Sequence, residues 1–486
     1  MNKFIPLFSK KEKLVANRMV EDIDPLPGYK GETRQILSRE KIKVWSEIVV
    51  TKQNGAHFQG ILLPRSAFTA PNFVTLRVLD TGYNIGVEIT DKTSFQLLGY
   101  SKGNYKLPAI NVKRKESLPD VVLLGTGGTV ASRLDYRTGA VLPAFTPEEL
   151  FAAVPEIQSR VNLTPRTLFE ILSENFKPEF WVKTAEEIAK EVNSGADGII
   201  IGHGTDTMAY TGSALSYFLK NLPIPVIILG SQRSSDRPSS DAAINLLNAA
   251  TVAGYADIGE VLISMMGSTS HKADYLHRPT RVRKMHSSRR DTFRSLSVPP
   301  VGKIDWKTQE ISYFSPVKSR ANPEDFRLDS KIDEKVAILY FYPGMNPDML
   351  HSVIDLGYHG VVMIGTGLGH VSSEFYPVLE RAQEEKVAIV MVVQPLYGFA
   401  HLRVYETGRE MLARGVIEGG NMLPEAAYPK LAYVLGHTGF PPSNLDDVKT
   451  LMQTNLVGEI TNRENRFGFS LLQGIEPGIE SLFESI

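Results

Sequence analysis

Four short polar segments of this sequence carry side chains that could attack a carbonyl group. The segments are Gly127-Gly128-Thr129, Ser173-Glu174, His203-Gly204-Thr205-Asp206-Thr207, and Lys284 within Arg-Val-Arg-Lys-Met-His. Together they supply two threonine hydroxyls, a carboxylate and an amine. These groups suffice for nucleophilic attack on an unactivated carbonyl without a metal or an organic cofactor. The rest of the chain must bring them together.

The glycine-rich segment 125–129 follows an apolar run at 121–124 and precedes a helical pattern. Val130 stands where the dinucleotide-binding fingerprint requires glycine, and no Gly-Lys-Ser/Thr sequence completes a P-loop. The glycines allow a ligand to approach the backbone closely, and the helix start offers N–H donors to a carboxylate or an oxyanion. A tight structural turn with Thr129 as a helix cap is the alternative interpretation.

The second polar loop, 203–207, follows the apolar run 198–201. Open α/β sheets bind ligands at the carboxyl ends of their strands, so we expect both loops to share one crevice. Helix capping by Asp206 or Thr207 is again the alternative, although five polar positions are more than a cap requires. His203 is expected to be a buried, hydrogen-bonded spacer rather than a base.

Composition excludes several classes of function. The 486 residues are 42% hydrophobic and 22% charged, with a net charge of -1, so no global field attracts nucleic acid or a membrane surface. The absence of cysteine excludes disulfides and thiolate zinc sites, and no histidine pair has metalloprotease spacing, so no metal is expected in this chain. The N-terminus does not read as a secretory signal, and no apolar run could span a membrane. A cytoplasmic protein is therefore expected.

The chain begins with two regions of different pattern. Residues 1–40 mix charge and proline without periodicity and are expected to form an N-terminal arm. Residues 41–115 contain short β-rich runs, with Asn54-Gly55 as a hairpin turn, and end in a polar, basic linker. Strands this short and closely spaced predict a small β-barrel.

From Pro119 onward, apolar runs alternate with amphipathic helical segments. This alternation predicts an α/β fold with parallel strands covered on both faces. We expect a large parallel-sheet α/β domain at 116–325, which carries the polar loops, and a smaller α/β domain at 326–440. Residues 441–486 exceed what the sheet needs and are interpreted as a C-terminal tail that contacts a partner.

Several motifs in residues 119–440 resemble those of bacterial-type L-asparaginases and glutaminases. Thr126-Gly127-Gly128-Thr129-Val130-Ala131 and His203-Gly204-Thr205-Asp206-Thr207-Met208 are similar to the two signatures of this family. Tyr136 matches its mobile tyrosine, and Ser173 matches its substrate-binding serine, with Glu174 in place of a neighbouring polar residue. Lys284 stands nine residues before Phe293, which is the family's spacing between lysine and phenylalanine.

The resemblance implies an amidase mechanism. A threonine hydroxyl, with Thr129 favoured, attacks the side-chain amide carbon, and Tyr136 helps to move the proton. Thr205, Asp206 and Lys284 act as a second triad. Substrate-binding positions are implied at Gly128, Ser173, Glu174 and Gly204, and Asp206 and Ser173 would hold the α-amino and α-carboxylate groups. Ammonia leaves, and water releases the acid product.

One loop departs from the family pattern. Family members often carry asparagine in the glycine-rich loop of the second domain, where it reaches the active site of a neighbouring protomer. Here that loop reads Gly365-Thr366-Gly367-Leu368-Gly369-His370. Leu368 and His370 thus replace the residues that would make the substrate contact between protomers, and His370 is a candidate site residue.

The β-rich prefix and the basic linker resemble a narrower group, the asparaginase-like, D-type subunits of archaeal glutamyl-tRNA(Gln) amidotransferases. This resemblance implies ammonia release from glutamine or asparagine for transamidation of Glu-tRNA(Gln). It implies an E-type partner subunit that uses ATP and Mg²⁺, no cofactor in this chain, and a homodimer within a heterotetramer. A free-standing L-asparaginase or glutaminase and a non-catalytic interaction scaffold remain alternatives.

The densest positive run comprises Arg278, Arg281, Arg283, Lys284, Arg289, Arg290 and Arg294. Contact with tRNA phosphates is one interpretation. A solvated loop, or a loop that pairs with acidic residues of this protein or of a partner, is the other.

Overall fold

The computed structural model describes most of the chain, namely residues 24–65, 70–79, 84–100, 114–127, 132–134, 141–143, 154–233, 240–269 and 272–463. Contacts divide the chain into an N-terminal unit, chiefly residues 1–107, and a larger unit that includes 143–235 and 239–486. None of the helices formed by the described residues is long and apolar enough to cross a membrane.

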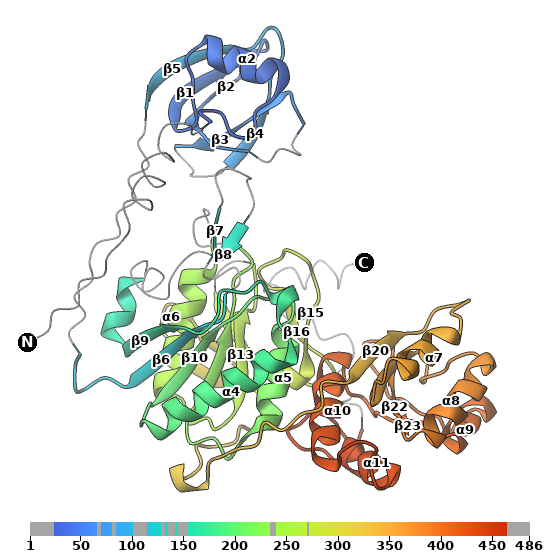
Figure 1. Ribbon diagram of the computed structural model, residues 1–486. Helices are drawn as coiled ribbons and strands as arrows, with labels where there is room; N and C mark the ends of the chain where they lie inside the picture. Colours follow the sequence, from blue (N-terminus) through green and yellow to red (C-terminus); the bar gives the residue numbers. More distant parts are fainter. Residues whose placement is uncertain are drawn as a thin grey trace, which may run out of the picture. The chain divides into compact units, whose positions relative to one another are not determined.

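The N-terminal unit contains a helix and an antiparallel five-stranded sheet in the order β4-β3-β2-β1-β5 (Figure 1). Its elements are α2 (Gly31–Arg39), β1 (Ser46–Thr51), β2 (His57–Leu62), β3 (Phe73–Val78), β4 (Asn84–Glu88) and β5 (Ser94–Tyr100). The predicted small all-β domain is confirmed. The ladders between described residues leave β4 and β5 at the two edges, so closure into a barrel stays a prediction.

The expected N-terminal arm is folded where the structure describes it, from residue 24 onward. Leu26, Tyr29 and Leu37 are buried in the core of the β-domain, and the Tyr29 hydroxyl donates a hydrogen bond to the Leu63 carbonyl at 2.7 Å. Ile36 and Leu37 are the only apolar residues in α2, too few to produce a strong helical pattern in the sequence. Tertiary packing therefore decides the structure of this segment.

The larger unit contains an eight-stranded sheet in the order β18-β17-β14-β13-β12-β10-β6-β9. Its strands are β6 (Asp120–Gly125), β9 (Asn162–Thr167), β10 (Gly198–Gly202), β12 (Val226–Leu229), β13 (Val261–Met266), β14 (Ala273–His277), β17 (Gly302–Asp305) and β18 (Ile311–Tyr313). The strands from β9 to β13 are parallel, whereas β14, β17 and β18 are antiparallel to their neighbours. We expected a sheet that is parallel throughout. The observed sheet is mixed instead.

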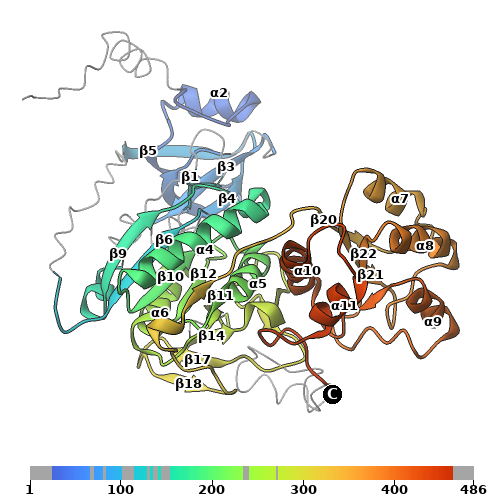
Figure 2. The same ribbon diagram turned by 60° about the horizontal axis from the view of Figure 1, so that its bottom comes forward.

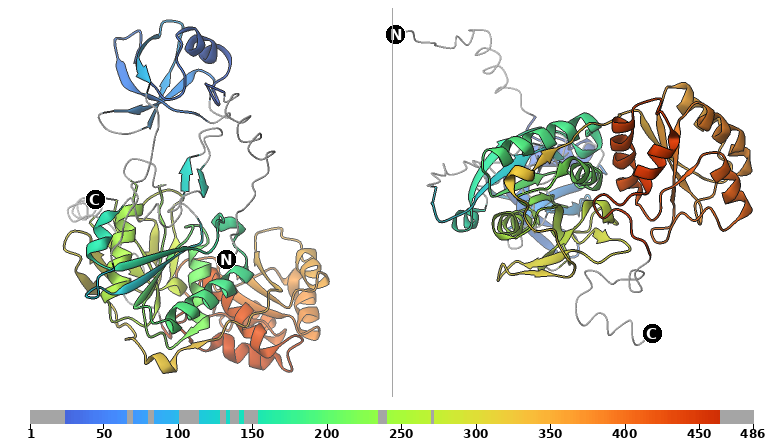
Figure 3. Two further views of the ribbon diagram at one scale, coloured as in Figure 1. Left: turned by 60° about the vertical axis from the view of Figure 1, so that its left-hand side comes forward. Right: turned by 90° about the horizontal axis from the view of Figure 1, so that it is seen from below.

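Helices cover both faces of this sheet (Figures 2 and 3). Successive strand residues face opposite sides, so Val122 and Ile201 join one core cluster while Leu123 and Ile200 join the other. The first cluster packs under α4 (Pro178–Asn193) and α5 (Met208–Phe218), and the second under α6 (Ala242–Tyr255). Burial on both faces explains why these strands are continuous apolar runs.

Short elements complete the large domain. They are β11 (Leu219–Lys220) with β19 (Arg327–Leu328), β15 (Val282–Lys284) with β16 (Phe293–Ser295), and the 3-10 turns η2 (Pro155–Ser159), η3 (Ser173–Asn175), η4 (Pro279–Arg281) and η5 (Pro323–Asp325). A separate two-stranded ladder pairs β7 (Ser132–Leu134) with β8 (Val141–Pro143), and contacts group residues 134–142 with the N-terminal unit.

The predicted smaller α/β domain contains a parallel sheet in the order β20-β21-β22-β23. Its elements are β20 (Val336–Tyr340), α7 (Asp348–Asp355), β21 (Gly360–Gly365), η6 (Ser373–Phe375), α8 (Tyr376–Glu384), β22 (Ala388–Val393), α9 (Glu406–Ala413), β23 (Ile417–Glu418), α10 (Pro424–Thr438) and α11 (Leu445–Gln453). Helix α10 joins this domain to the large one, because it packs on the sheet and its Ala426 carbonyl accepts a hydrogen bond from Tyr217 of α5.

The segment interpreted as a tail, 441–486, begins with structure that belongs to the smaller domain. Val448 and Met452 of α11 are buried in the core beneath β21 and β22. Residues 454–463 then return to the large domain, where Leu456 and Val457 pack against its core. Residues 464–486 of this segment lie outside the described residues, and the partner contact predicted for 441–486 stays a prediction.

Candidate active site

The two polar loops leave neighbouring strands at the same edge of the large sheet. β6 and β10 are parallel and paired so that Gly125 lies opposite Gly202. The next residue after β6, Thr126, is buried and donates from both its backbone N–H and its hydroxyl to the Gly202 carbonyl, each at 2.9 Å. The loops that carry the candidate site residues therefore begin side by side, as the sequence predicts.

Lys284 reaches the second loop from a distant part of the chain. Its Nζ donates to the Thr205 hydroxyl at 2.9 Å and to an Asp206 carboxylate oxygen at 2.8 Å. The Lys284 side chain is only 14% exposed, whereas that of Asp206 is 67% exposed. Thr205 itself is buried. A hydroxyl, an amine and a carboxylate thus lie in hydrogen-bonding contact, with the carboxylate open to an incoming ligand.

Ser173 lies beside this group because the segment after β9 packs against the loop after β10. The Ser173 hydroxyl lies 3.5 Å from the second Asp206 oxygen, at the long limit of a hydrogen bond. The Thr207 hydroxyl donates to the Ser173 carbonyl at 2.8 Å and holds the two loops together. A Cβ atom at Gly204 would lie 2.6 Å from the Ser173 Cβ, so only glycine allows this close approach.

The first loop is described only as far as Gly127. Gly127 has φ +104°, and a Cβ atom there would lie 2.3 Å from the Ile171 carbonyl oxygen, so glycine is required on both counts. This contact packs the loop against the segment that precedes Ser173. Gly128, Thr129 and Tyr136 lie outside the described residues, and their roles stay predictions.

The prediction that His203 is a buried spacer is confirmed. Its Nδ1 lies 2.7 Å from the Gly204 carbonyl oxygen, which can only accept, so Nδ1 carries the ring proton. Nε2 then accepts from the Thr211 hydroxyl at 2.9 Å, and Thr211 in turn accepts from the Trp181 ring N–H at 3.1 Å. Burial lowers the pKa of His203 to about 4. A neutral imidazole with both nitrogens engaged positions the loop and is not a base.

The contacts among described residues do not connect two other candidate residues, Glu174 and His370, to the group formed by Thr205, Asp206 and Lys284. Glu174 follows Ser173 in η3 and is exposed. His370 lies in the smaller domain, where its Nδ1 is 3.3 Å from the Thr407 hydroxyl and its ring contacts Tyr405. Substrate binding by Glu174 and the role of His370 therefore stay predictions.

Most of the positive run around Lys284 is engaged within the chain. Arg278 forms an ion pair with Glu260, Arg283 with Glu425, and both Arg289 and Arg294 with Asp291. Arg281 is buried and donates to two backbone carbonyls. These contacts favour the interpretation of the run as internally paired rather than as a surface for tRNA phosphates.

Sequence reasoning singled out the triad but not the residues that hold it. The sequence indicates Thr207 only as a possible helix cap, and Arg281 and Arg283 only as members of a charged run. Their partners lie far away in sequence, at Ser173, Asn421 and Glu425. The proximity of the two arginines to Lys284 is the only sequence signal that could have drawn attention to them.

Models of three protein families match this chain. The asparaginase N-terminal domain matches residues 120–318, the glutaminase/asparaginase C-terminal domain 335–452, and the GatD N-terminal domain 42–98. The solved structure of the thermostable L-asparaginase from Thermococcus kodakarensis superposes with a TM-score of 0.62 and 32% identity, covering 71% of this chain and 100% of that one. The fold predicted from the motifs is thereby confirmed.

Curated relatives match almost from end to end. The D-type subunit of the glutamyl-tRNA(Gln) amidotransferase of Thermococcus kodakarensis is 47% identical over 436 residues, covering 89% of this chain and 98% of the relative. The corresponding protein of Pyrococcus abyssi, which carries the same name, is 44% identical over 434 residues, covering 88% and 97%. The GatD N-terminal domain matches a region that precedes both asparaginase domains in the chain. The chain therefore belongs to the family of D-type glutamyl-tRNA(Gln) amidotransferase subunits.

Proposed function

We propose that this chain is the amidohydrolase subunit of a tRNA-dependent amidotransferase. It releases ammonia from the side-chain amide of glutamine, and the ammonia converts Glu-tRNA(Gln) to Gln-tRNA(Gln). Its likeness to D-type subunits along almost their whole length supports this reaction. The observation that carries the proposal is the contact of the Lys284 amine with the Thr205 hydroxyl and the Asp206 carboxylate at the end of β10.

In the proposed chemistry a threonine oxygen, of Thr129 or Thr205, attacks the amide carbon and forms a C–O bond. The C–N bond then breaks, and the nitrogen leaves as ammonia with the proton that the hydroxyl released. Lys284 relays or holds this proton next to Thr205, Asp206 orients the amine, and Tyr136 assists at Thr129. Water hydrolyses the resulting ester and releases glutamate. Backbone N–H groups of the glycine turns stabilise the oxyanion.

The same groups account for substrate recognition in this proposal. The exposed carboxylate of Asp206 attracts the α-ammonium group of glutamine, and the Ser173 hydroxyl donates to its α-carboxylate. Gly128, Gly204 and Glu174 complete the pocket. Because glutamine and asparagine differ by one methylene, discrimination between the two donors amounts to about 1–3 kcal/mol.

The partner in this proposal is the E-type subunit of the amidotransferase, which activates tRNA-bound glutamate with ATP and Mg²⁺. Two copies of this chain form a homodimer within the heterotetramer. Most of the charged run around Lys284 is engaged internally, and in this proposal tRNA reaches the assembly through the partner.

The test is ammonia release by the purified chain with glutamine or asparagine, alone and with the E-type subunit, ATP and Glu-tRNA(Gln). We expect slow release by the chain alone and faster release in the complete assembly. Thr205→Ala and Lys284→Met should each reduce kcat by about 10³-fold or more, because the proton relay is broken. Lys190→Met, an exposed lysine of α4, is the matched control and should retain full activity. Normal activity in either site variant would remove that residue from the mechanism.

A free-standing L-asparaginase is the second candidate, favoured by the likeness to the whole of a solved L-asparaginase. It predicts fast hydrolysis of asparagine by the chain alone and no response to the E-type subunit or to tRNA. A non-catalytic scaffold predicts no ammonia release under any of these conditions. The Thr205–Lys284–Asp206 contact argues against a scaffold, because a scaffold gains nothing from it.

A further inference from the structure

Lys284 is carried by a hairpin that is too small to hold its own position. β15 and β16 pair through three residue pairs, and Lys284 lies opposite Phe293 at the far end of the ladder. An isolated two-stranded hairpin is only marginally stable. The position of the Lys284 amine therefore depends on what holds this hairpin to the rest of the chain.

Arg281 fixes the base of the hairpin. Its side chain is 1% exposed, and Nη1 donates to the Asn421 carbonyl at 2.9 Å and to the Glu459 carbonyl at 3.0 Å. The Arg281 carbonyl accepts from the N–H of Leu296, the first residue after β16, at 2.8 Å. One residue thus ties both ends of the hairpin to backbone more than a hundred residues later in the chain.

Arg283 provides a second attachment, from the face of β15 opposite to the one that carries Lys284. Side chains alternate along β15, so Arg283 points away from the face on which Lys284 lies. Its Nε contacts a carboxylate oxygen of Glu425 at 2.8 Å. Glu425 lies in the first turn of α10 and its side chain is only 8% exposed. The attachment therefore leads to the helix that joins the two domains.

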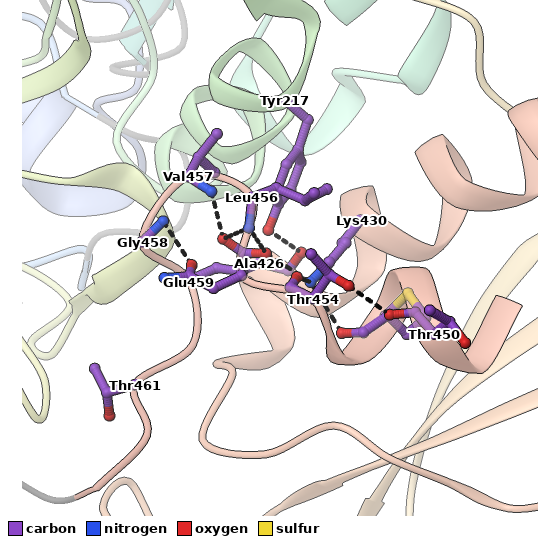
Figure 4. A network of polar contacts seen from close by, with 12 residues as sticks. Tyr217, Ala426, Lys430, Thr450, Thr454, Leu456, Val457, Gly458, Glu459 and Thr461 are labelled. Carbon is purple, nitrogen blue, oxygen red and sulfur yellow. Dashed lines mark hydrogen bonds and ion pairs between the residues drawn. The ribbon is translucent and has the colours of Figure 1, made fainter. Parts of the chain in front are cut away.

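One of the two acceptor residues of Arg281, Glu459, also forms a buried ion pair (Figure 4). Lys430 of α10 and Glu459 are both 0% exposed, with 2.6 Å between Nζ and the carboxylate. Lys430 also donates to the carbonyls of Met452 and Thr454, so each of its three hydrogens has an acceptor. Glu459 accepts from the N–H groups of its own turn at Leu456 and Val457. We call residues 454–461 the C-terminal clamp.

Asn421 and Thr461 close the network. The Asn421 side chain donates to the Thr461 hydroxyl at 2.6 Å and accepts from the Thr461 N–H at 3.0 Å. These contacts hold together the two stretches of backbone that Arg281 bridges. The backbone that Arg281 binds is therefore held by further hydrogen bonds at both Glu459 and Asn421.

We propose that Arg281 is a positioning residue for the reaction, which sets the Lys284 amine against Thr205 by anchoring the β15–β16 hairpin to the C-terminal clamp. The inference rests on the proposed function in two respects, namely that Lys284 takes part in ammonia release and that Ser173 and Asp206 bind the substrate. Substrate contacts come from Ser173 and Asp206, which lie on other loops. Loosening the anchor therefore affects turnover and leaves substrate binding in place.

The test compares Arg281→Lys with Arg320→Lys in the full-length chain. Arg320 is the matched control, because its guanidinium also donates to backbone carbonyls, those of Ala256 and Asp197, but not to the clamp or the hairpin. We expect Arg281→Lys to lower kcat by about 10- to 100-fold with KM within about twofold, since a displacement of about 1 Å costs that much. Arg320→Lys should leave both constants unchanged.

Hydrogen exchange of peptides covering 279–296 supplies a readout that does not depend on activity. It should become faster in Arg281→Lys and remain unchanged in Arg320→Lys. Thr461→Val, which removes one contact of the clamp, should show both effects to a smaller degree and replaces Arg281→Lys if that variant does not fold. Three outcomes would overturn the proposal. The first is an equal loss of kcat in Arg320→Lys, and the second is a loss of kcat/KM in Arg281→Lys that a rise in KM explains. The third is unchanged hydrogen exchange of 279–296 in Arg281→Lys. An inactive wild-type chain with faster exchange in Arg281→Lys would instead contradict the proposed function and leave the anchor standing.

Discussion

The Lys284 amine and the Asp206 carboxylate form an ion pair whose two partners have very different exposure. The amine is shielded by the large domain, whereas the carboxylate faces solvent. A shielded donor keeps a defined position between Thr205 and Asp206, and an exposed carboxylate remains free to meet a cationic group of a ligand. This asymmetry suits a site in which one member of the pair acts on the enzyme's hydroxyl and the other on the substrate.

Another buried acid of the large domain gives a prediction about pH. Asp274 of β14 is fully buried, and this burial, with the nearby charge of Asp241, raises its pKa to about 7. The unfolded chain ionises Asp274 near pH 3.8, so between these values the folded state binds the extra proton and stability falls as pH rises. We expect the unfolding free energy of the wild type, relative to Asp274→Asn, to fall by about 2–3 kcal/mol from pH 5 to pH 8. Urea unfolding at the two pH values measures it, and a constant difference would contradict it.

At the scale of elements, the close approach of the β10 loop to the Ser173 segment gives a further prediction. Gly204→Ala places a Cβ atom 2.6 Å from the Ser173 Cβ, so the loops must separate. We expect kcat/KM to fall by about 10-fold or more, mainly through KM, because Ser173 is displaced from the substrate.

The matched control lies two residues earlier. A Cβ atom at Gly202 has no neighbour closer than the Leu124 carbonyl oxygen at 4.0 Å, so Gly202→Ala should stay within about threefold of the wild type. Steady-state kinetics with glutamine compares the two variants. Equal kinetic constants in both would show that the approach of Gly204 to Ser173 has no bearing on the site.

Within the large sheet, the apolar runs of the sequence predicted three strands that are buried on both faces. β6, β10 and β12 are uninterrupted apolar runs because both sides of the sheet are covered. The sequence did not predict β9, because β9 is a half-exposed edge strand that contains Pro165 in its ladder. The antiparallel strands β14, β17 and β18 escaped for a similar reason, since their short polar sequences take their register from neighbours rather than from their own pattern.

The site residues also divide into those that the sequence could place and those that it could not. Thr205 and Asp206 could be placed from the sequence because each follows a recognisable strand, and parallel strands end at one edge. Lys284 was found only through its family spacing, since nothing local indicates that β15 meets the β10 loop. Arg281 and the C-terminal clamp could not be found, because their contacts join segments far apart in the chain.

At the scale of the whole molecule, the Lys430–Glu459 pair is expected to stabilise the fold only while both partners are present. Lys430→Met leaves a carboxylate buried without its cation and should lower the unfolding free energy by about 3–5 kcal/mol. The double variant Lys430→Met/Glu459→Gln removes both charges and keeps an acceptor for the N–H groups of Leu456 and Val457. It should recover most of the loss. Chemical denaturation of the three proteins measures this, and equal losses in the single and double variants would contradict it.

Loss of the C-terminal part of the chain would remove Glu459 and so break this ion pair. A polypeptide that stops, or is cut, before residue 459 can still fold its strands and helices up to α11, yet it retains a bare ammonium group inside the joint between its domains. Arg281 would lose one of its carbonyl acceptors in the same event. Shortened products of synthesis or proteolysis would therefore be less stable, and the hairpin that carries Lys284 would be less firmly anchored.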